Sequence, residues 1–332
     1  MYELPSLAEV AQRAHVVSIP MKVKFRGVEH REALLFEGPA GWGEFSPFLE
    51  YGAEESSAWL ASAIEAAWVG FPEPLREHIP VNATLPAVGV ERVAKVLSNY
   101  ESIHTIKVKV AERGQDLDQD LARLTEVRRL YPQANVRIDA NAGWSVSEAQ
   151  NALTAMAGFD LQYAEQPVAS IEDLALIREF VRSENLGILI AADESVRKAE
   201  DPLAVARAGA ADLIIIKAQP LGGVRKALQI VADAGLPAVV SSALDTSIGL
   251  RQGAALAAAL PELPYACGLA TGSLLSSDIT QDRYLAVKGA LDLRTITADP
   301  ALLKAHAVNT QRHQWWMERL TACYRALNSK LS

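Results

Sequence analysis

Three acidic side chains end successive apolar runs in the middle of this chain: Asp139, Glu165 and Asp193. They lie 26 and 28 residues apart, which is about the length of one strand plus one crossover helix. Because neighbouring parallel strands end at the same edge of a sheet, we expect the three carboxylates to converge. Carboxylates gathered away from water need a compensating cation, and all-oxygen ligation suits Mg2+ or a similar hard ion such as Mn2+. Taken singly, each acid could instead cap the helix that follows it.

Lysines flank this acidic set on both sides along the chain. The run before Asp139 contains Lys107-Val108-Lys109, and since side chains alternate along a strand, both ammonium groups point the same way. If they face the interior, mutual repulsion and burial are expected to depress the lysine pKa and provide a general base near neutral pH. If they face solvent, they are ordinary surface lysines.

A further lysine, Lys217, ends the run that follows Asp193. It would enter from the opposite side to Lys109. A Schiff-base enzyme is the competing interpretation of this residue, but such an enzyme has no need of three converging carboxylates. Together these side chains predict a metal-assisted reaction in which a lysine removes the proton next to a substrate carboxylate and the cation stabilises the resulting enediolate.

The elements that must position these residues alternate from about residue 80 onward. β-Branched runs are followed by longer helical segments, such as 116–130, 171–181 and 224–234, which is typical of parallel βα units. Eight runs can be counted, at 81–85, 105–110, 135–141, 161–167, 188–195, 212–219, 238–244 and 265–271. The pattern predicts an α/β fold with a (β/α)8, TIM-like barrel. An open doubly wound sheet is the alternative, but the first run lacks the glycine-rich turn of that fold.

The two ends of the chain have a different pattern. Residues 1–80 combine short alternating stretches with one helical segment, and the tail beyond 280 contains an apolar helical stripe. The stripe consists of Trp315, Trp316, Leu320, Cys323, Tyr324 and Leu327. We therefore expect an α+β capping domain formed by residues 1–80 with 280–332, and a catalytic barrel at 81–279.

Bulk composition excludes several classes of function. The net charge is −8, with 40 acidic and 32 basic residues and no long basic run, which disfavours nucleic acid as a partner and favours a small molecule. Only two cysteines occur, Cys267 and Cys323, so no disulfide framework is expected. The sequence shows neither a signal-peptide pattern nor a membrane-spanning stretch, and we expect a cytoplasmic protein without a membrane partner. The oligomeric state is left open.

Five short motifs stand in register at the ends of the runs: K-x-K at 107–109, D-x-N at 139–141, E-Q-P at 165–167, D-E-S at 193–195 and the final lysine at 217. This series resembles the enolase superfamily and, within it, the muconate-lactonizing subgroup. The resemblance covers essentially the whole chain, since that family also has a cap built from both chain ends. It implies that Asp139, Glu165 and Asp193 are metal ligands, that Lys109 and Lys217 lie on opposite faces of the substrate, and that Lys107 tunes Lys109.

Softer similarities narrow this resemblance. The cap segment at 31–48 and the stretches at 241–245 and 268–272 resemble members that dehydrate 2-succinyl-6-hydroxy-2,4-cyclohexadiene-1-carboxylate in menaquinone biosynthesis. In such members Lys109 would take the proton and return it to the departing hydroxyl, while Lys217 would act as a cation. The substrate carboxylates would bind at Ser241, Ser242, Gly268 and Thr271, through N–H groups at helix starts. Turn and cap chemistry is the alternative role of these four residues.

Other functions are compatible with the same residues. Dipeptide epimerisation or N-acylamino acid racemisation needs two bases on opposite faces, which Lys109 and Lys217 supply equally well. A histidine base is excluded, because no histidine ends a run from the third to the eighth. The more distant alternative is a non-catalytic barrel that serves as a scaffold.

On the cap, we expect Phe48 and Tyr51 to close over the substrate.

Overall fold

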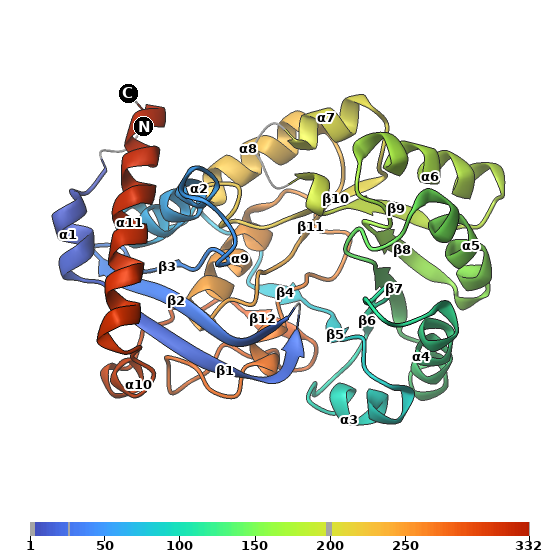
Figure 1. Cartoon of the computed structure of the whole chain (residues 1–332), viewed down its shortest axis with the longest axis horizontal. Helices are drawn as coiled ribbons and strands as arrows, with labels where there is room; N and C mark the ends of the chain where they lie inside the picture. The colour runs from blue at the N-terminus through green and yellow to red at the C-terminus, as the bar shows by residue number, and fades with distance from the viewer. Residues whose placement is uncertain (1–3, 26, 197–200, 332) are drawn as a thin grey trace.

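A curled parallel sheet forms the centre of the computed structural model, which describes residues 4–25, 27–196 and 201–331 (Figure 1). Seven strands are joined in the order β11-β10-β9-β8-β7-β6-β5, and every neighbouring pair is parallel. They are β5 (Ala83–Leu85), β6 (Thr105–Lys109), β7 (Asn135–Asp139), β8 (Leu161–Glu165), β9 (Leu189–Ala192), β10 (Leu213–Ile216) and β11 (Ala238–Val240). These are the first seven predicted runs, each trimmed at its ends.

The eighth predicted run forms single bridges instead of a strand. Cys267 bridges Val81, next to β5, and Gly268 bridges Ser241, next to β11, both in parallel. These two bridges connect the edges of the sheet, so the barrel closes. Soon after Gly268 the chain turns into a short 3-10 helix, Thr271–Leu274, so the predicted run leaves the sheet before a longer ladder forms.

Helices follow the strands and cover the outside of the barrel. They are α3 (Val93–Leu97), α4 (Leu117–Leu130), α5 (Val146–Met156), α6 (Ile171–Ser183), α7 (Asp201–Arg207), α8 (Val224–Ala234) and α9 (Ser247–Ala259). Several start where the sequence offers a cap: the side chains of Asp116, Ser145, Ser170 and Thr246 accept a backbone N–H from the first turn. The three predicted helical segments are confirmed as α4, α6 and α8.

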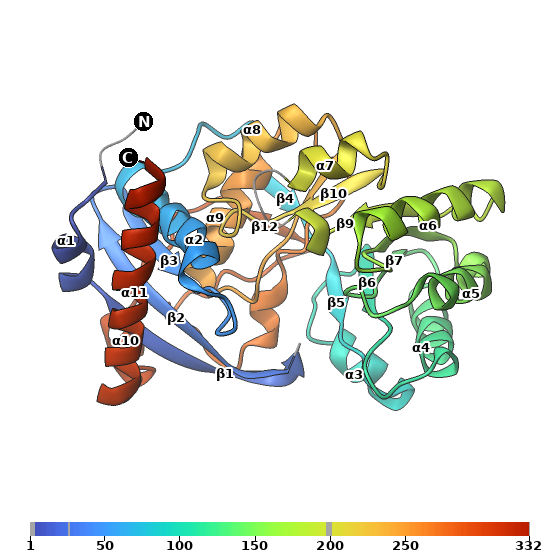
Figure 2. The ribbon, with the colours of Figure 1, turned by 45° about the horizontal axis from the view of Figure 1, so that its top comes forward.

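A second layer, the cap, is built from both ends of the chain. Its antiparallel sheet contains β1 (His15–Phe25), β2 (Val28–Gly38) and β3 (Gly41–Phe45), and its helices are α1 (Leu7–Gln12), α2 (Ala53–Ile64), α10 (Pro300–Ala305) and α11 (Thr310–Leu331). A small sheet pairs β4 (His78–Pro80) with β12 (Ala290–Asp292). In Figures 1 and 2 the red helix α11 lies along the blue N-terminal elements. The placement of the domain boundaries at 80 and 280 stays a prediction.

Two large apolar cores hold these layers, and a third, smaller cluster lies on β8 to β11. The cap core contains the predicted stripe of α11, with Trp316, Leu320, Cys323 and Leu327 packed against β2, β3 and α2. The other face of β1 and β2 packs into the barrel core through Val17, Ile19, Ala33 and Leu35. Both cysteines are buried and form no disulfide, as expected. Within the described residues, no helix is long and apolar enough to cross a membrane.

Trp316 is expected to be the main anchor of α11. It is fully buried, it stands edge-on to Phe45, and its indole Nε1 donates to Glu32 Oε2 at 2.7 Å. Replacement of Trp316 by alanine should lower the free energy of unfolding by about 3–5 kcal/mol. Urea denaturation would measure this loss, with Gln314→Ala on the exposed side of α11 as the control. Equal stabilities of the two variants would contradict this role.

Candidate active site

The register of the parallel sheet brings the predicted lysine and acidic residues to one edge. Lys109 is paired with Asp139 across β6 and β7, and Asp139 is paired with Glu165 across β7 and β8. Glu165 in turn pairs with Ala191 on β9, two residues before Asp193. All these positions are at the carboxyl ends of their strands, where barrels of this kind place their chemistry. The parity argument for Lys107 and Lys109 is thereby confirmed.

Each of the three carboxylates contacts a lysine. Lys107 Nζ lies 2.9 Å from Glu165 Oε1 and 3.1 Å from Asp139 Oδ2. Lys109 Nζ donates to Asp139 Oδ2 and, at 2.6 Å, to Asn141 Oδ1. Lys217 Nζ donates to Asp193 Oδ1. The site therefore contains three ammonium groups and three carboxylates, arranged across the mouth of the barrel.

Burial and mutual repulsion set the electrostatics of the carboxylates. Burial, together with the negative charges of Asp139 and Asp193, raises the pKa of Glu165 to about 8. Burial opposes ionisation of Asp139 as well, but the ammonium groups of Lys109 and Lys107 hold the pKa of that carboxyl well below its usual value. For Asp193, Lys217 likewise outweighs burial and lowers the pKa.

One electrostatic expectation is wrong for Lys107. Repulsion and burial were expected to depress the pKa of these lysines. Burial does favour the neutral amine of Lys107, but the carboxylates of Glu165 and Asp139 outweigh it and raise the pKa well above the usual value. The acids on β7 and β8 lie close to Lys107, and alternation along β6 alone does not predict these contacts between strands. Lys107 is thus a permanent cation at the base of the site.

The donor set fits a hard divalent ion. Three carboxylates meet there, close enough for two of them to raise the pKa of the third, and oxygen donors of this kind suit Mg2+ or Mn2+. Within the described part of the chain, however, no group of three His, Cys, Asp or Glu side chains has a spacing that could hold a metal ion as it stands. Each carboxylate binds a lysine instead, so an ion would have to displace these contacts.

A hollow of about 40 Å³ lies over the three lysines, Asp139 and Asp193 and brings them together with the predicted substrate-binding residues, whereas Glu165 is not part of its walls. Its walls include Phe48 from the cap and a set of barrel residues: Thr84, Lys107, Lys109, Asp139, Asn141, Asp193, Lys217, Ser241, Ser242, Ala243, Leu244, Gly268 and Thr271. A neighbouring hollow of about 20 Å³ adds Tyr51 and Trp59. Phe48 thus shares a hollow with all three lysines and Tyr51 shares one with Lys217. That these two residues close over a substrate stays a prediction.

The predicted anion contacts need one correction. The backbone N–H of Ser241 donates to Ile216 and that of Gly268 donates to Val240, both at 2.8 Å, so these two groups cannot serve as carboxylate donors. Both N–H groups hold neighbouring backbone segments of the barrel together. Hydroxyl groups remain at the pocket: Ser242 Oγ lies 2.8 Å from both Gly268 O and Thr271 Oγ1.

Gln166 is a structural part of the site whose role the sequence did not reveal. It is fully buried, and its Oε1 accepts the backbone N–H groups of Asp193 and Ser195 at 2.9 and 3.2 Å. Its Nε2 donates to Ser195 Oγ at 2.7 Å and to Val168 O at 2.8 Å. The amide thus ties the end of β8 to the end of β9 and fixes the direction of Asp193. The motif letters E-Q-P were the only signal of this contact.

Two more buried carboxylates, Glu44 of β3 and Asp245 after β11, lie behind the pocket wall. Glu44 accepts from Thr246 Oγ1 at 2.5 Å and from the Gly249 N–H at 2.9 Å, and Asp245 accepts from Gln219 Nε2 at 3.0 Å. Burial and the charge of Glu44 raise the pKa of Asp245 to about 7, against the opposing charges of Arg31 and Lys217. Burial raises the pKa of Glu44 as well.

Asp245 is therefore expected to make stability depend on pH. Its folded-state pKa, about 7, exceeds its ordinary value of 3.8, so the native state binds the proton more tightly, and the free energy of unfolding should fall as pH rises between these values. The slope from this group is at most about 1.4 kcal/mol per pH unit. Asp245→Asn should remove that slope in urea denaturation from pH 4.5 to 7.5. An unchanged slope would exclude this assignment, and exposed Asp233→Asn is the control.

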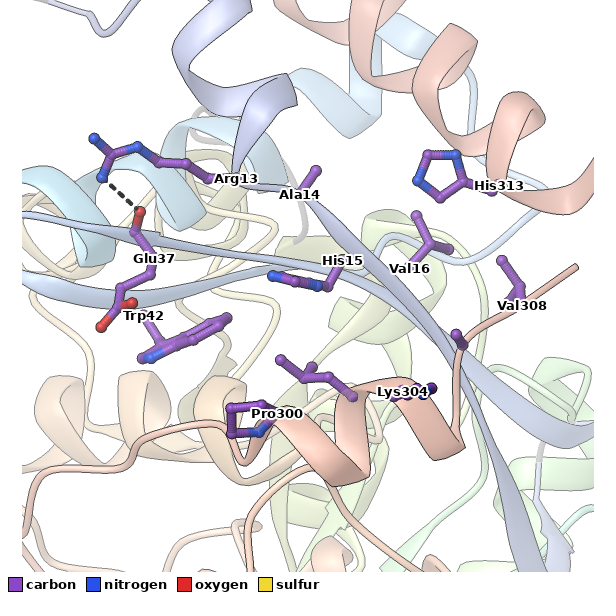
Figure 3. A pocket seen from close by; sticks show the side chains of 12 residues that line it. Arg13, Ala14, His15, Val16, Glu37, Trp42, Pro300, Lys304, Val308 and His313 are labelled. Carbon is purple, nitrogen blue, oxygen red and sulfur yellow. Dashed lines mark hydrogen bonds between the residues drawn. The ribbon is translucent and has the colours of Figure 1, made fainter. Parts of the chain in front are cut away.

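A much larger hollow, of about 550 Å³, lies elsewhere, at the outer edge of the cap (Figure 3). Its walls combine Arg13, His15 and Trp42 with residues of α10 and the start of α11. In Figure 3 Arg13 points to the backbone oxygen of Glu37, to which it donates at 3.2 Å. None of the predicted site residues lines this hollow, so size alone does not locate the chemistry.

The comparisons with known proteins agree with the fold and the motifs. The family model described as "Enolase C-terminal domain-like" matches residues 90–297, and "Enolase N-terminal domain-like" matches residues 16–67. The chain belongs to the enolase superfamily. Solved structures with this fold include a muconate lactonizing enzyme of Pseudomonas fluorescens (TM-score 0.77, 21% identity) and a 2-chloromuconate cycloisomerase of Rhodococcus opacus (TM-score 0.75, 22% identity), each covering 89% of this chain and 98% of its own.

Curated relatives are more similar and carry a more specific name. The chain is 50% identical to the o-succinylbenzoate synthase of Mycolicibacterium smegmatis, over 97% of this chain and 98% of that protein. It is 49% identical to the o-succinylbenzoate synthase of Mycobacterium leprae, over 98% of this chain and 95% of the relative. Similarity at this level extends across both the cap and the barrel.

Proposed function

We propose that this chain is a lyase that performs o-succinylbenzoate synthesis, by dehydration of 2-succinyl-6-hydroxy-2,4-cyclohexadiene-1-carboxylate in menaquinone biosynthesis. The main support is the 50% identity to o-succinylbenzoate synthase over nearly the full length, together with lysines and acids gathered at one edge of the barrel. The partner is a small carboxylate, and we keep the expectation of a cytoplasmic enzyme that binds neither nucleic acid nor membrane.

In this proposal Lys109 performs both proton transfers. Its neutral amine takes the proton from the ring carbon that carries the carboxylate. The resulting ammonium group gives the proton to the hydroxyl on the neighbouring carbon, on the same face, so that the carbon–oxygen bond breaks, water leaves and the ring becomes aromatic. Asn141 Oδ1, 2.6 Å from Lys109 Nζ, orients the amine.

The other charged groups hold the substrate and its developing charge. Lys217 faces the ring from the opposite side as a cation, and Lys107 stays protonated between Glu165 and Asp139. Asp139, Glu165 and Asp193 are the proposed ligands of a divalent ion, Mg2+ or Mn2+, which supplies positive charge beside the substrate carboxylate when bound. The hydroxyl groups of Ser242 and Thr271, with Ser241 and Gly268 shaping the wall, are proposed to bind the succinyl end of the substrate.

One observation favours a second activity on the same residues. Lys109 is the last residue of β6, and Lys217 directly follows β10. The two amines therefore approach the hollow from different parts of the barrel wall. Two bases on opposite faces are what racemisation of an N-acylamino acid or epimerisation of a dipeptide requires. Deuterium exchange at the α-carbon of such substrates would reveal this activity.

The direct test is turnover of the cyclohexadiene substrate, followed by ultraviolet absorbance as the ring becomes aromatic. We expect turnover with Mg2+, its loss after treatment with EDTA, and its return when Mg2+ or Mn2+ is added. A folded, metal-supplied protein that leaves the substrate unchanged would exclude the synthase assignment. Deuterium exchange would then decide between a racemase or epimerase and a non-catalytic scaffold.

A further inference from the structure

Arg31 of β2 lies directly behind the wall of the pocket and is 3% exposed. Its guanidinium group makes contacts in two directions. Toward the cap, Nη2 donates to Ser46 O, and the group lies 4.8 Å from the centre of the Phe48 ring. Toward the barrel, Nε donates to Leu244 O at 3.1 Å. A single side chain thus joins the loop after β3 to the loop after β11.

Both loops supply walls of the hollow over the lysines. Phe48 and Leu244 line it together, and both are buried. Phe48 comes from the cap and Leu244 from the barrel, so the distance between them depends on how the cap is seated. The guanidinium group bonds directly to the backbone of both loops, through Ser46 O and Leu244 O.

The backbone at Leu244 needs such a contact. Its φ is +63°, in the left-handed region that β-branched and other bulky L-residues rarely adopt. A conformation of this kind persists only where the surroundings hold it in place. The hydrogen bond from Arg31 to the carbonyl of Leu244 itself is one of those restraints, and it comes from the other layer of the molecule.

The charge of Arg31 is balanced in the same region. Glu44 and Asp245 lie close enough to act on its guanidinium group, and Ser46 Oγ donates to Glu44 Oε1 at 2.6 Å. Glu44 also accepts from the first residues of α9, so the network continues from the cap into the barrel helix that follows Leu244. Because the buried charge of Arg31 has partners in both the cap and the barrel, it defines the geometry of the contact between them.

We propose that Arg31 is a positioning residue for the substrate: it fixes the spacing between Phe48 and Leu244 and thereby couples the seating of the cap to the shape of the pocket. The kinetic test of this role rests on the proposed dehydration. The coupling of the two loops does not depend on it. It deepens the proposed function, because it names a specificity-determining contact outside the residues that perform the chemistry.

The kinetic test compares Arg31→Lys and Arg31→Ala with the parent protein in the ultraviolet assay. Since the wall contributes to binding and Lys109 is untouched, KM should rise about 10-fold or more while kcat falls by less than about 3-fold in Arg31→Lys. In Arg31→Ala, added guanidinium ion should lower KM again, whereas NaCl at the same ionic strength should not. Arg312→Lys, which alters an ion pair with Glu32 elsewhere in the cap, is the matched control and should keep the parent KM.

A second measurement needs no substrate. Hydrogen–deuterium exchange should become faster in peptides covering 46–51 and 241–247 in Arg31→Ala and stay unchanged in Arg312→Lys. An unchanged KM in a folded Arg31→Ala protein would overturn the proposal, and so would a loss of activity that only follows the folded fraction and does not respond to guanidinium. If the parent protein itself fails to turn over the substrate while the exchange pattern is as expected, the synthase assignment fails and the coupling of the loops stands.

Discussion

Replacement of Lys109 by methionine is expected to lower kcat for aromatisation by about 10³-fold or more, because one amine performs both the proton abstraction and the protonation of the leaving hydroxyl. Methionine keeps the length and much of the volume of the side chain, so the barrel should still fold. The loss would be measured by ultraviolet absorbance at saturating substrate and Mg2+. KM should change much less than kcat, since Lys109 acts on the reacting atoms and not on the remote carboxylate.

A matched control separates this loss from a general effect of removing a lysine. Lys95→Met on α3 removes an equally flexible cation from an exposed position and should retain the parent kcat. Activity in Lys109→Met within a few-fold of the parent would remove this residue from the proposed mechanism and direct attention to Lys217 as the base. The pair of variants therefore tests whether Lys109 itself is the base.

Replacement of Glu165 by glutamine is expected to abolish both divalent-ion binding and turnover. The proposed metal binding uses the ionised form of Glu165, whereas glutamine supplies only a neutral oxygen and leaves the three lysines opposed by two carboxylates. Affinity for Mg2+ should fall by about 100-fold or more. Titration calorimetry with the metal alone would measure this affinity without reference to any substrate.

Glu172→Gln, at the exposed start of α6, is the control for this experiment and should bind Mg2+ as the parent does. Unchanged Mg2+ affinity in folded Glu165→Gln would show that the ion, if required, binds elsewhere. If affinity is retained but turnover is lost, the carboxylate would act through Lys107, which contacts both of its oxygens. Calorimetry and kinetics together distinguish these roles.

The features of this molecule that could be predicted from its sequence are those that depend on the local periodicity of strands and βα units. Alternation along a strand placed Lys107 and Lys109 on one face, and the spacing of Asp139, Glu165 and Asp193 by whole βα units placed the acids side by side. The seven strands and the three named crossover helices follow from the same patterns. Parity and spacing do not depend on the rest of the fold, which is why these predictions were confirmed.

The remaining features depend on partners far away in the chain. Arg31 meets Leu244 across 213 residues, and Glu44 meets Thr246 across 202, with no periodic pattern to connect them. The pKa of Lys107 was predicted with the wrong sign because its dominant neighbours belong to other strands. The eighth strand was overestimated because the chain leaves the sheet after Gly268 and forms the short helix Thr271–Leu274. Long-range electrostatics and packing, which a single sequence does not display, decided each of these points.

The cap sheet and its covering helix lie far apart in the sequence, since α2 ends at Ile64 and α11 begins at Thr310. Residues of β2, β3 and α2, including Leu34, Phe36, Phe45 and Trp59, are buried partly by α11. At about 5–20 residues per second, the ribosome releases these strands roughly 15 to 50 s before the helix emerges. For that interval the nascent chain carries half of an apolar layer in water, where other chains can bind it. Aggregation during synthesis is therefore expected to compete with folding at this layer until α11 covers it.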